Sequence, residues 1–163
     1  MAVTVKPITL WRKEINNKPG ALAETLEPLA TQGADLQVVM GYRYPGHKEK
    51  AAIELYPVAG RKLSAAAQAA GLHEGSISAL LVEGDNQVGL GHAIAQAIAG
   101  AGINLDFLVA QVVGRKYSAV LGFESDADMK KAVPLIRKAT LSKQMGPRKV
   151  AKKGTPDASR KLR

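Results

Sequence analysis

The sequence contains no cysteine, which excludes disulfide bonds, thiolate metal ligands and a cysteine nucleophile. Aromatic residues make up only 4% of its 163 residues, so the core must be built from aliphatic side chains and methionine. No apolar run approaches the roughly 18 residues that a membrane-spanning helix needs. The first residues do not form the charged and then apolar segment of a secretory signal. A cytoplasmic protein with one ordinary domain or two small ones is therefore expected.

Acidic residues are nearly missing from the end of the chain. Residues 142–163 contain eight basic residues and one acidic residue, about +7 of the net charge of +9, which leaves residues 1–141 nearly neutral. This basic tail lacks hydrophobic periodicity, so we expect it to be disordered. Its charge suits the phosphates of nucleic acid or an acidic partner, but it equally suits a purely solubilising tail. The candidates for nucleic-acid contact are Arg148, Lys149, Lys152 and Lys153.

One stretch of the sequence occurs twice. In both copies an asparagine and a glycine separate a strand pattern from a helix pattern, and a second glycine follows the helix. A shift of 69 positions, without a gap, places Asn17 on Asn86, Gly20 on Gly89, Gly33 on Gly102 and Leu36 on Leu105. Two copies are too few for a solenoid, so the repeat indicates two similar small domains or one pseudo-symmetric domain.

Hydrophobic periodicity and turn residues divide both copies into the same succession of elements. The first copy predicts a strand at 8–15, a helix between the Asn17 loop and Gly33, strands at 35–44 and 51–56, and a helix at 61–70. The second predicts a strand at 77–83, a helix at 88–99, strands at 103–113 and 117–123, and a helix at 126–138. Asn17 is the expected N-cap of the first helix, and Ser125 or Asp126 that of the last. Pro28 and Pro134 should kink or shorten their helices.

The order βαββα, found twice, predicts an α+β fold with two ferredoxin-like βαββα(β) units in tandem. Each unit should be an antiparallel sheet with helices packed on one face. We place the units at residues 1–72 and 73–141, followed by the tail at 142–163. A ferredoxin-like unit has a fourth strand, but only one strand lies between Gly71 and Gly84. The fourth strand is therefore very short, or the units share or exchange strands.

The strand at 103–113 is apolar on both faces. Phe107 and Val109 lie on one face, and Leu108 and Val112 on the other. A sheet that is covered on one side only should alternate apolar and polar residues. The second face is therefore expected to be covered by the other unit or by another chain, although a partly exposed apolar face is the simpler alternative.

Most catalytic and cofactor motifs are missing. Gly89 and Gly91 suggest a dinucleotide-binding loop, but Ile94 stands where the third glycine would fall. The three histidines are not spaced as metal ligands, and no serine–histidine–acid set is legible. We therefore expect no metal, no cofactor and no enzymatic activity.

The repeated loop itself has a possible use. Where a strand ends and a helix begins, unpaired N–H groups and the helix dipole can hold a carboxylate. Gly20 and Gly89 would let a ligand approach the backbone closely, and Asn17 and Asn86 offer both donor and acceptor atoms. The structural alternative is that the asparagine caps the helix and the glycine only permits the turn.

These motifs, within βαββα units, resemble the ACT domain, a small regulatory module that binds amino acids. The resemblance rests on residues 17–22 with 33–36, and on residues 86–90 with 102–105, and it covers nearly all of residues 7–140 as two tandem units. It implies an effector amino acid bound between paired units, at the loop and the start of the second strand. The implied ligand-binding residues are Asn86, Gly89, Leu90 and Asn104 in the second unit and Asn17, Gly20 and Asp35 in the first. Asp35 and Val88 depart from the asparagine and proline usual in the family.

The leading hypothesis is therefore a non-enzymatic regulatory protein that binds a small ligand, expected to be an amino acid, at the interface between ACT-like units. Its partners would be a second copy of the chain, or an enzyme or regulator. One alternative is a nucleic-acid-associated protein that acts through the basic tail. Another is an interaction module without a ligand.

Overall fold

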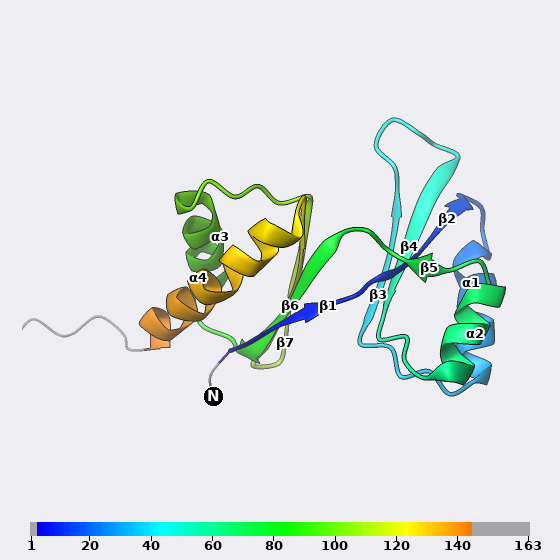
Figure 1. Ribbon diagram of the computed structural model, residues 1–163, viewed down its shortest axis with the longest axis horizontal. Helices are drawn as coiled ribbons and strands as arrows, with labels where there is room; N and C mark the ends of the chain where they lie inside the picture. Colours follow the sequence, from blue (N-terminus) through cyan, green and yellow to red (C-terminus); the bar gives the residue numbers. More distant parts are fainter. Residues whose placement is uncertain (1–2, 145–163) are drawn as a thin grey trace, which may run out of the picture.

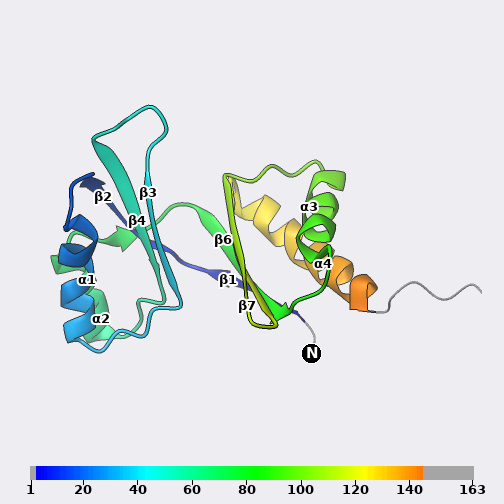
Figure 2. The same ribbon diagram turned by 180° about the vertical axis from the view of Figure 1, so that it is seen from behind.

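A computed structural model describes residues 3–144 of the chain, with side chains through residue 141. Two four-stranded antiparallel sheets lie next to each other, and each is covered by two helices on the side away from the other sheet (Figure 1). The view from behind shows the same succession of layers, helix–sheet–sheet–helix (Figure 2). The predicted α+β fold with two ferredoxin-like units is confirmed.

The first sheet has the strand order β3-β4-β2-β5. Its unit consists of β2 (Trp11–Asn16), α1 (Ala21–Thr31), β3 (Val38–Arg43), β4 (Lys50–Tyr56), α2 (Arg61–Ala69) and β5 (His73–Glu74). Both helices pack on one face of the sheet, around a core that includes Trp11, Leu29, Ile53 and Leu55. The strands β3 and β5 form the two edges of this sheet.

The second sheet has the order β1-β6-β8-β7. Its elements are β1 (Thr4–Ile8), β6 (Ser78–Asp85), α3 (Leu90–Gly100), β7 (Phe107–Val113), β8 (Lys116–Phe123) and α4 (Asp126–Gln144). The helices α3 and α4 cover one face, and Leu80, Ile94, Leu121 and Ile136 lie fully buried between helices and sheet. The strands β1 and β7 are the edges.

Both possibilities for the fourth strand are realised. The first unit closes with β5, a strand of only two residues that pairs with β2. The second unit takes its fourth strand from the N-terminus, because β1 pairs with β6 over Thr4–Ile8. The strands therefore do not follow the predicted division at residue 72: β1 belongs to the second sheet and β5 to the first. The two connections run side by side between the units (Figure 1).

The predicted single strand at 8–15 is wrong, because the chain changes sheets within it. Ile8 ends β1 and Trp11 begins β2. Leu10 and Trp11 are adjacent, yet they are 1% and 5% exposed. Leu10 packs between the two sheets and Trp11 packs under the helices of the first unit.

The helix-free faces of the two sheets pack against each other. Their shared core includes Leu10 from the first connection, Met40 from the first sheet, and Ile8, Leu81 and Val120 from the second. This contact covers only part of β7: Phe107 packs against it, whereas Leu108, Val109, Val112 and Val113 remain between 48% and 68% exposed. The other unit thus does not account for both apolar faces of β7.

The helix ends follow the sequence signals in part. The hydroxyl of Ser125 accepts a hydrogen bond from the Asp128 N–H, 3.1 Å away, so the predicted cap of α4 is confirmed. Pro28 and Pro134 lie inside α1 and α4, and α4 continues past its predicted end at residue 138. The residues proposed for nucleic-acid contact, Arg148, Lys149, Lys152 and Lys153, lie outside the described residues. None of the helices in residues 3–144 is long and apolar enough to cross a membrane.

Candidate functional site

The repeated loop of the first unit connects β2 to α1. The Asn17 N–H donates to the carbonyl of Glu49 at 2.8 Å, and the Asn17 Nδ2 donates to the carbonyl of Lys48 at 3.0 Å. Gly20 stands directly before α1 with φ of 89°, where a side chain would be strained. No side chain caps α1. The predicted N-cap role of Asn17 is therefore wrong, because its amide fixes the loop to the β3–β4 hairpin instead.

A cavity of about 210 Å³ opens beside this loop, between the start of α1 and the edge strand β3. Two of its lining residues are cationic: Lys18 comes from the loop and Arg43 from the end of β3. The remaining lining includes the small residues Ala21, Gly41 and Ala51, which leave space above the sheet. Because the start of α1 adds the positive end of a helix dipole, this cavity suits a carboxylate.

The loop of the second unit has the same backbone arrangement. The Asn86 N–H donates to the carbonyl of Arg115 at 2.8 Å, as Asn17 does to Glu49. Gly89 precedes α3 with φ of 77°. The side chain of Leu90, however, is 2% exposed and packs in the core of the unit. This predicted ligand contact could therefore offer only its backbone, whose N–H already donates to the carbonyl of Gln87.

An ion pair lies next to the second loop. Lys116 Nζ is 2.6 Å from the Asp85 carboxylate, and this contact is the largest of the interactions that lower the pKa of Asp85 to about 2. In the first unit the corresponding strand pair is Asn16 and Lys50, which carries no acidic group. The two copies of the loop therefore differ in charge.

The two halves of each motif lie at opposite ends of a helix. Gly20 precedes α1 and Asp35 follows it, and α3 separates Gly89 from Asn104 in the same way. A helix of 11 residues is about 16 Å long. A single unit thus does not bring Asp35 or Asn104 to its own loop, and their contact with a ligand stays a prediction.

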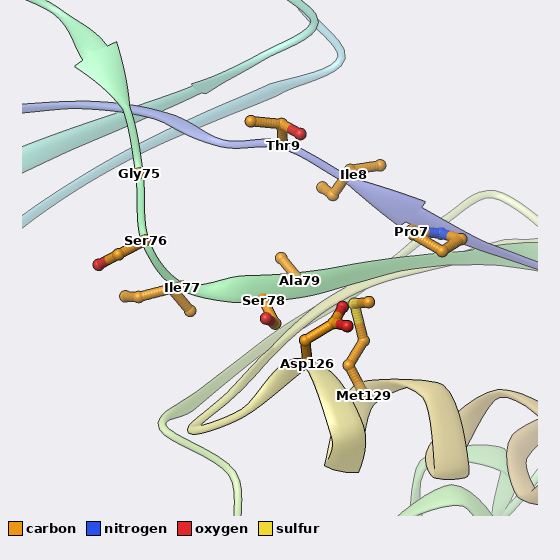
Figure 3. A pocket seen from close by; sticks show the side chains of 10 residues that line it. All are labelled: Pro7, Ile8, Thr9, Gly75, Ser76, Ile77, Ser78, Ala79, Asp126 and Met129. Atoms are coloured by element: carbon orange, nitrogen blue, oxygen red, sulfur yellow. The ribbon is translucent and has the colours of Figure 1, made fainter.

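A larger cavity, of about 320 Å³, lies where the two connections between the units meet the start of α4. Figure 3 shows Asp126 and Met129 reaching from α4 toward the beginning of β6. Hydroxyl groups of Thr9, Ser76 and Ser78 also line this cavity, together with apolar residues and no Lys or Arg. Its one charged group is a carboxylate, so it is not suited to an anion. Among residues 3–144, no group of three or more His, Asp or Glu side chains could hold a metal ion.

The first sheet carries a polar cluster that the sequence pattern did not reveal. Glu54 is 1% exposed. Its Oε1 accepts hydrogen bonds from Arg12 Nη1 at 2.9 Å and from the Tyr42 hydroxyl at 3.1 Å. Tyr44 joins the cluster through Arg12 and through Glu14 Oε1 at 2.8 Å. Burial and the charge of Glu54 raise the pKa of Tyr42. Arg12 lies 2.9 Å from the carboxylate of Glu54 and 3.8 Å from that of Glu14, so both acidic groups have an ionic partner, which favours a structural role.

Comparisons with solved structures identify the architecture. The regulatory subunit of aspartate kinase from Thermus thermophilus, in its ligand-free form, has a TM-score of 0.58 at 16% identity over 85% of this chain and 97% of that one. Protein BT0572 from Bacteroides thetaiotaomicron gives 0.66 at 13% identity, over 82% of this chain and 89% of that one. Escherichia coli aspartokinase III in complex with aspartate and ADP gives 0.52 at 13% identity, over 86% of this chain and 33% of that one.

These likenesses establish an ACT-like fold with two units in tandem, the fold of aspartate kinase regulatory subunits. Neither a protein-family model nor a curated protein matches the sequence.

Proposed function

We propose that this protein is a regulatory amino-acid-binding protein, and that its ligand binds in the cavity beside the first loop. The observation that carries the proposal is the meeting of Lys18, Arg43 and the start of α1 around one cavity. The fold shared with aspartate kinase regulatory subunits supports a regulatory role. Aspartate is the first ligand to test, because one structural neighbour was solved with aspartate bound.

In the proposed complex the ligand carboxylate lies at the start of α1. It accepts hydrogen bonds from backbone N–H groups there and pairs with Arg43. Gly20 lets the ligand approach the backbone, and Ala21 and Ala51 leave room for the ligand side chain. A charge-assisted hydrogen bond contributes about 1.5–3 kcal/mol, so Arg43 alone accounts for roughly tenfold or more in affinity.

A second copy of the chain is the partner that would complete the site. Both β3 and β7 are free edges, and Val39 and Val112 on them are 45% and 49% exposed. If two β3 edges pair antiparallel, the start of one strand faces the end of the other. That pairing would carry Asp35, which precedes β3, from one chain toward the Asn17 loop of its partner, where its carboxylate would suit the ligand ammonium group. Ligand binding would then favour one arrangement of the pair and pass the signal to a regulated enzyme through linkage.

Thermal unfolding with each of the twenty amino acids tests the proposal. A ligand present at 100 times its Kd stabilises the folded state by about 2.7 kcal/mol. For a chain of this size that is a rise in Tm of roughly 5–10 °C. The proposal fails if no amino acid at about 10 mM raises Tm, since a regulatory site should be well filled at that concentration.

Two variants locate the site. Arg43→Met should weaken binding of the active amino acid about tenfold or more without changing the fold. Lys62→Met removes a cation from the exposed surface of α2, outside the cavity, and should leave Kd unchanged. Equal losses in both variants would show that only the general charge of the protein matters, and would overturn the assignment to this cavity.

A further inference from the structure

The strand pairing defines which residues of the two units are equivalent beneath the loops. Ile15 pairs with Ala51 between β2 and β4. Its counterpart in the shift of 69, Gly84, pairs with Tyr117 between β6 and β8. Tyr117 therefore occupies in the second unit the place that Ala51 occupies on the floor of the first cavity.

Tyr117 is buried under the start of α3. The residue is 5% exposed, and its hydroxyl is buried with no hydrogen-bond partner among the described residues. Gly91 lies next to it: a Cβ at Gly91 would be in ordinary van der Waals contact with the Tyr117 hydroxyl, at 3.9 Å. The counterpart of Gly91 in the first unit is Leu22, which is 42% exposed and lines the open cavity. In the first unit the residue under the loop is small (Ala51) and the residue on the helix is large (Leu22). In the second unit the residue under the loop is large (Tyr117) and the residue on the helix is glycine (Gly91).

A second position also carries a larger side chain in the second unit than in the first. Ala21, which lines the first cavity, corresponds to Leu90, whose side chain fills the core below α3. A third difference is that the second unit lacks the two positive charges of the first cavity. In the shift of 69, the two cations of the first cavity correspond to neutral residues: Lys18 to Gln87, and Arg43 to Val112.

We propose that Tyr117 is a built-in plug that closes the second copy of the ligand site, so that each chain binds a single amino acid, in its first unit. The proposal rests on the proposed function for the position of the open site. In this proposal Tyr117 and Gly91 make the two units differ in ligand binding: the site of the first unit is open and that of the second is closed. The second unit then supplies β6 for the N-terminal strand and a free edge at β7.

Phenol tests the plug without reference to any natural ligand. Tyr117→Ala removes the phenol group, and buried cavities of about 150 Å³ are known to bind molecules of the size of benzene. The variant should melt about 10 °C below the wild type. Phenol at millimolar concentration should raise the Tm of the variant by several degrees and leave the wild type unchanged. The proposal that Tyr117 closes the site would be overturned if phenol did not raise the Tm of Tyr117→Ala, or if phenol raised the Tm of the wild type by the same amount.

Tyr117→Phe provides a second test that does not depend on whether Tyr117→Ala folds. Because the hydroxyl has no partner among the described residues, its removal should leave Tm unchanged or raise it. A clear fall in Tm would show that the hydroxyl makes a required contact, and would overturn the description of Tyr117 as a filler of space.

Calorimetry gives the stoichiometry. The wild type should bind one amino acid per chain, and a first site plugged by Leu22→Gly with Ala51→Tyr should bind none. Two equivalents per wild-type chain would overturn the plug and leave the proposed function standing. No binding by the wild type would overturn the proposed function, while the phenol result would still decide whether Tyr117 fills the second site.

Discussion

Arg12→Met should be among the most destabilising single changes on the surface of the first sheet. The Arg12 side chain is 19% exposed and that of Glu54 only 2%, and their charged atoms lie 2.9 Å apart. Removing Arg12 leaves the Glu54 carboxylate buried with only the Tyr42 hydroxyl as a donor. Breaking one partner of a buried pair costs about 3–5 kcal/mol. Because Arg12 is partly exposed, we expect about 3 kcal/mol and a fall in Tm of roughly 6–12 °C.

Urea unfolding of three variants tests this reasoning. Replacing both partners, Arg12→Met with Glu54→Leu, removes the buried charge and should recover most of the lost stability. Lys130→Met breaks an exposed pair with Asp126, with side chains 73% and 59% exposed, and should cost about 0.5 kcal/mol or less. The reasoning is refuted if Arg12→Met costs no more than Lys130→Met, or if the double variant is as unstable as the single one.

Three further predictions follow from the packing and the charges. Gly122→Ala should cost about 1–3 kcal/mol in urea unfolding, because its Cβ would lie 2.6 Å from Phe107 Cδ1. Gly100→Ala meets nothing within 4 Å and should be neutral or stabilising. Asp85, with its pKa lowered to about 2, should stabilise the fold above about pH 4 and lose this effect as the pH falls through 2. In an NMR titration Lys116→Met should return this pKa toward 3.8, and an unchanged value would exclude the ion pair as its cause. Deletion of residues 1–8 removes the buried side chains of Val5 and Ile8. It should lower the unfolding free energy of the second unit by about 3–6 kcal/mol. If the amide hydrogens of β6 exchanged at an unchanged rate, the pairing of β1 with β6 would be contradicted.

The repeat carried most of the fold prediction. Two copies of the same strand–loop–helix pattern at a constant shift placed all four helices and the two hairpins in the described chain, with ends that moved by a few residues. The exchange of strands was not predicted, because two adjacent apolar residues, Leu10 and Trp11, interrupt the alternation without showing that the chain leaves one sheet for another. Periodicity reports which residues are buried and not which sheet buries them.

The candidate site was predictable only near the loop. Gly20 and Asn17 lie where the motif placed them, but the cavity is completed by Arg43 and Ala51 from strands later in the chain. Only the pairing of β2, β3 and β4 brings these residues under the loop. A comparison of equivalent strand positions in the two copies would have distinguished the two units, because Ala51 and Tyr117 differ in size at equivalent positions.

The most direct test of the central claim is an NMR titration of the ¹⁵N-labelled protein with aspartate and with any amino acid that raises Tm. Binding at the first loop should shift the amide signals of Lys18, Gly20, Leu22 and Arg43 together, with one Kd. The signals of Gly89 and Gly91 in the second loop should not follow this curve. Shifts centred instead on Thr9 and Ser76 at the larger cavity, or no shift with any amino acid, would contradict the account.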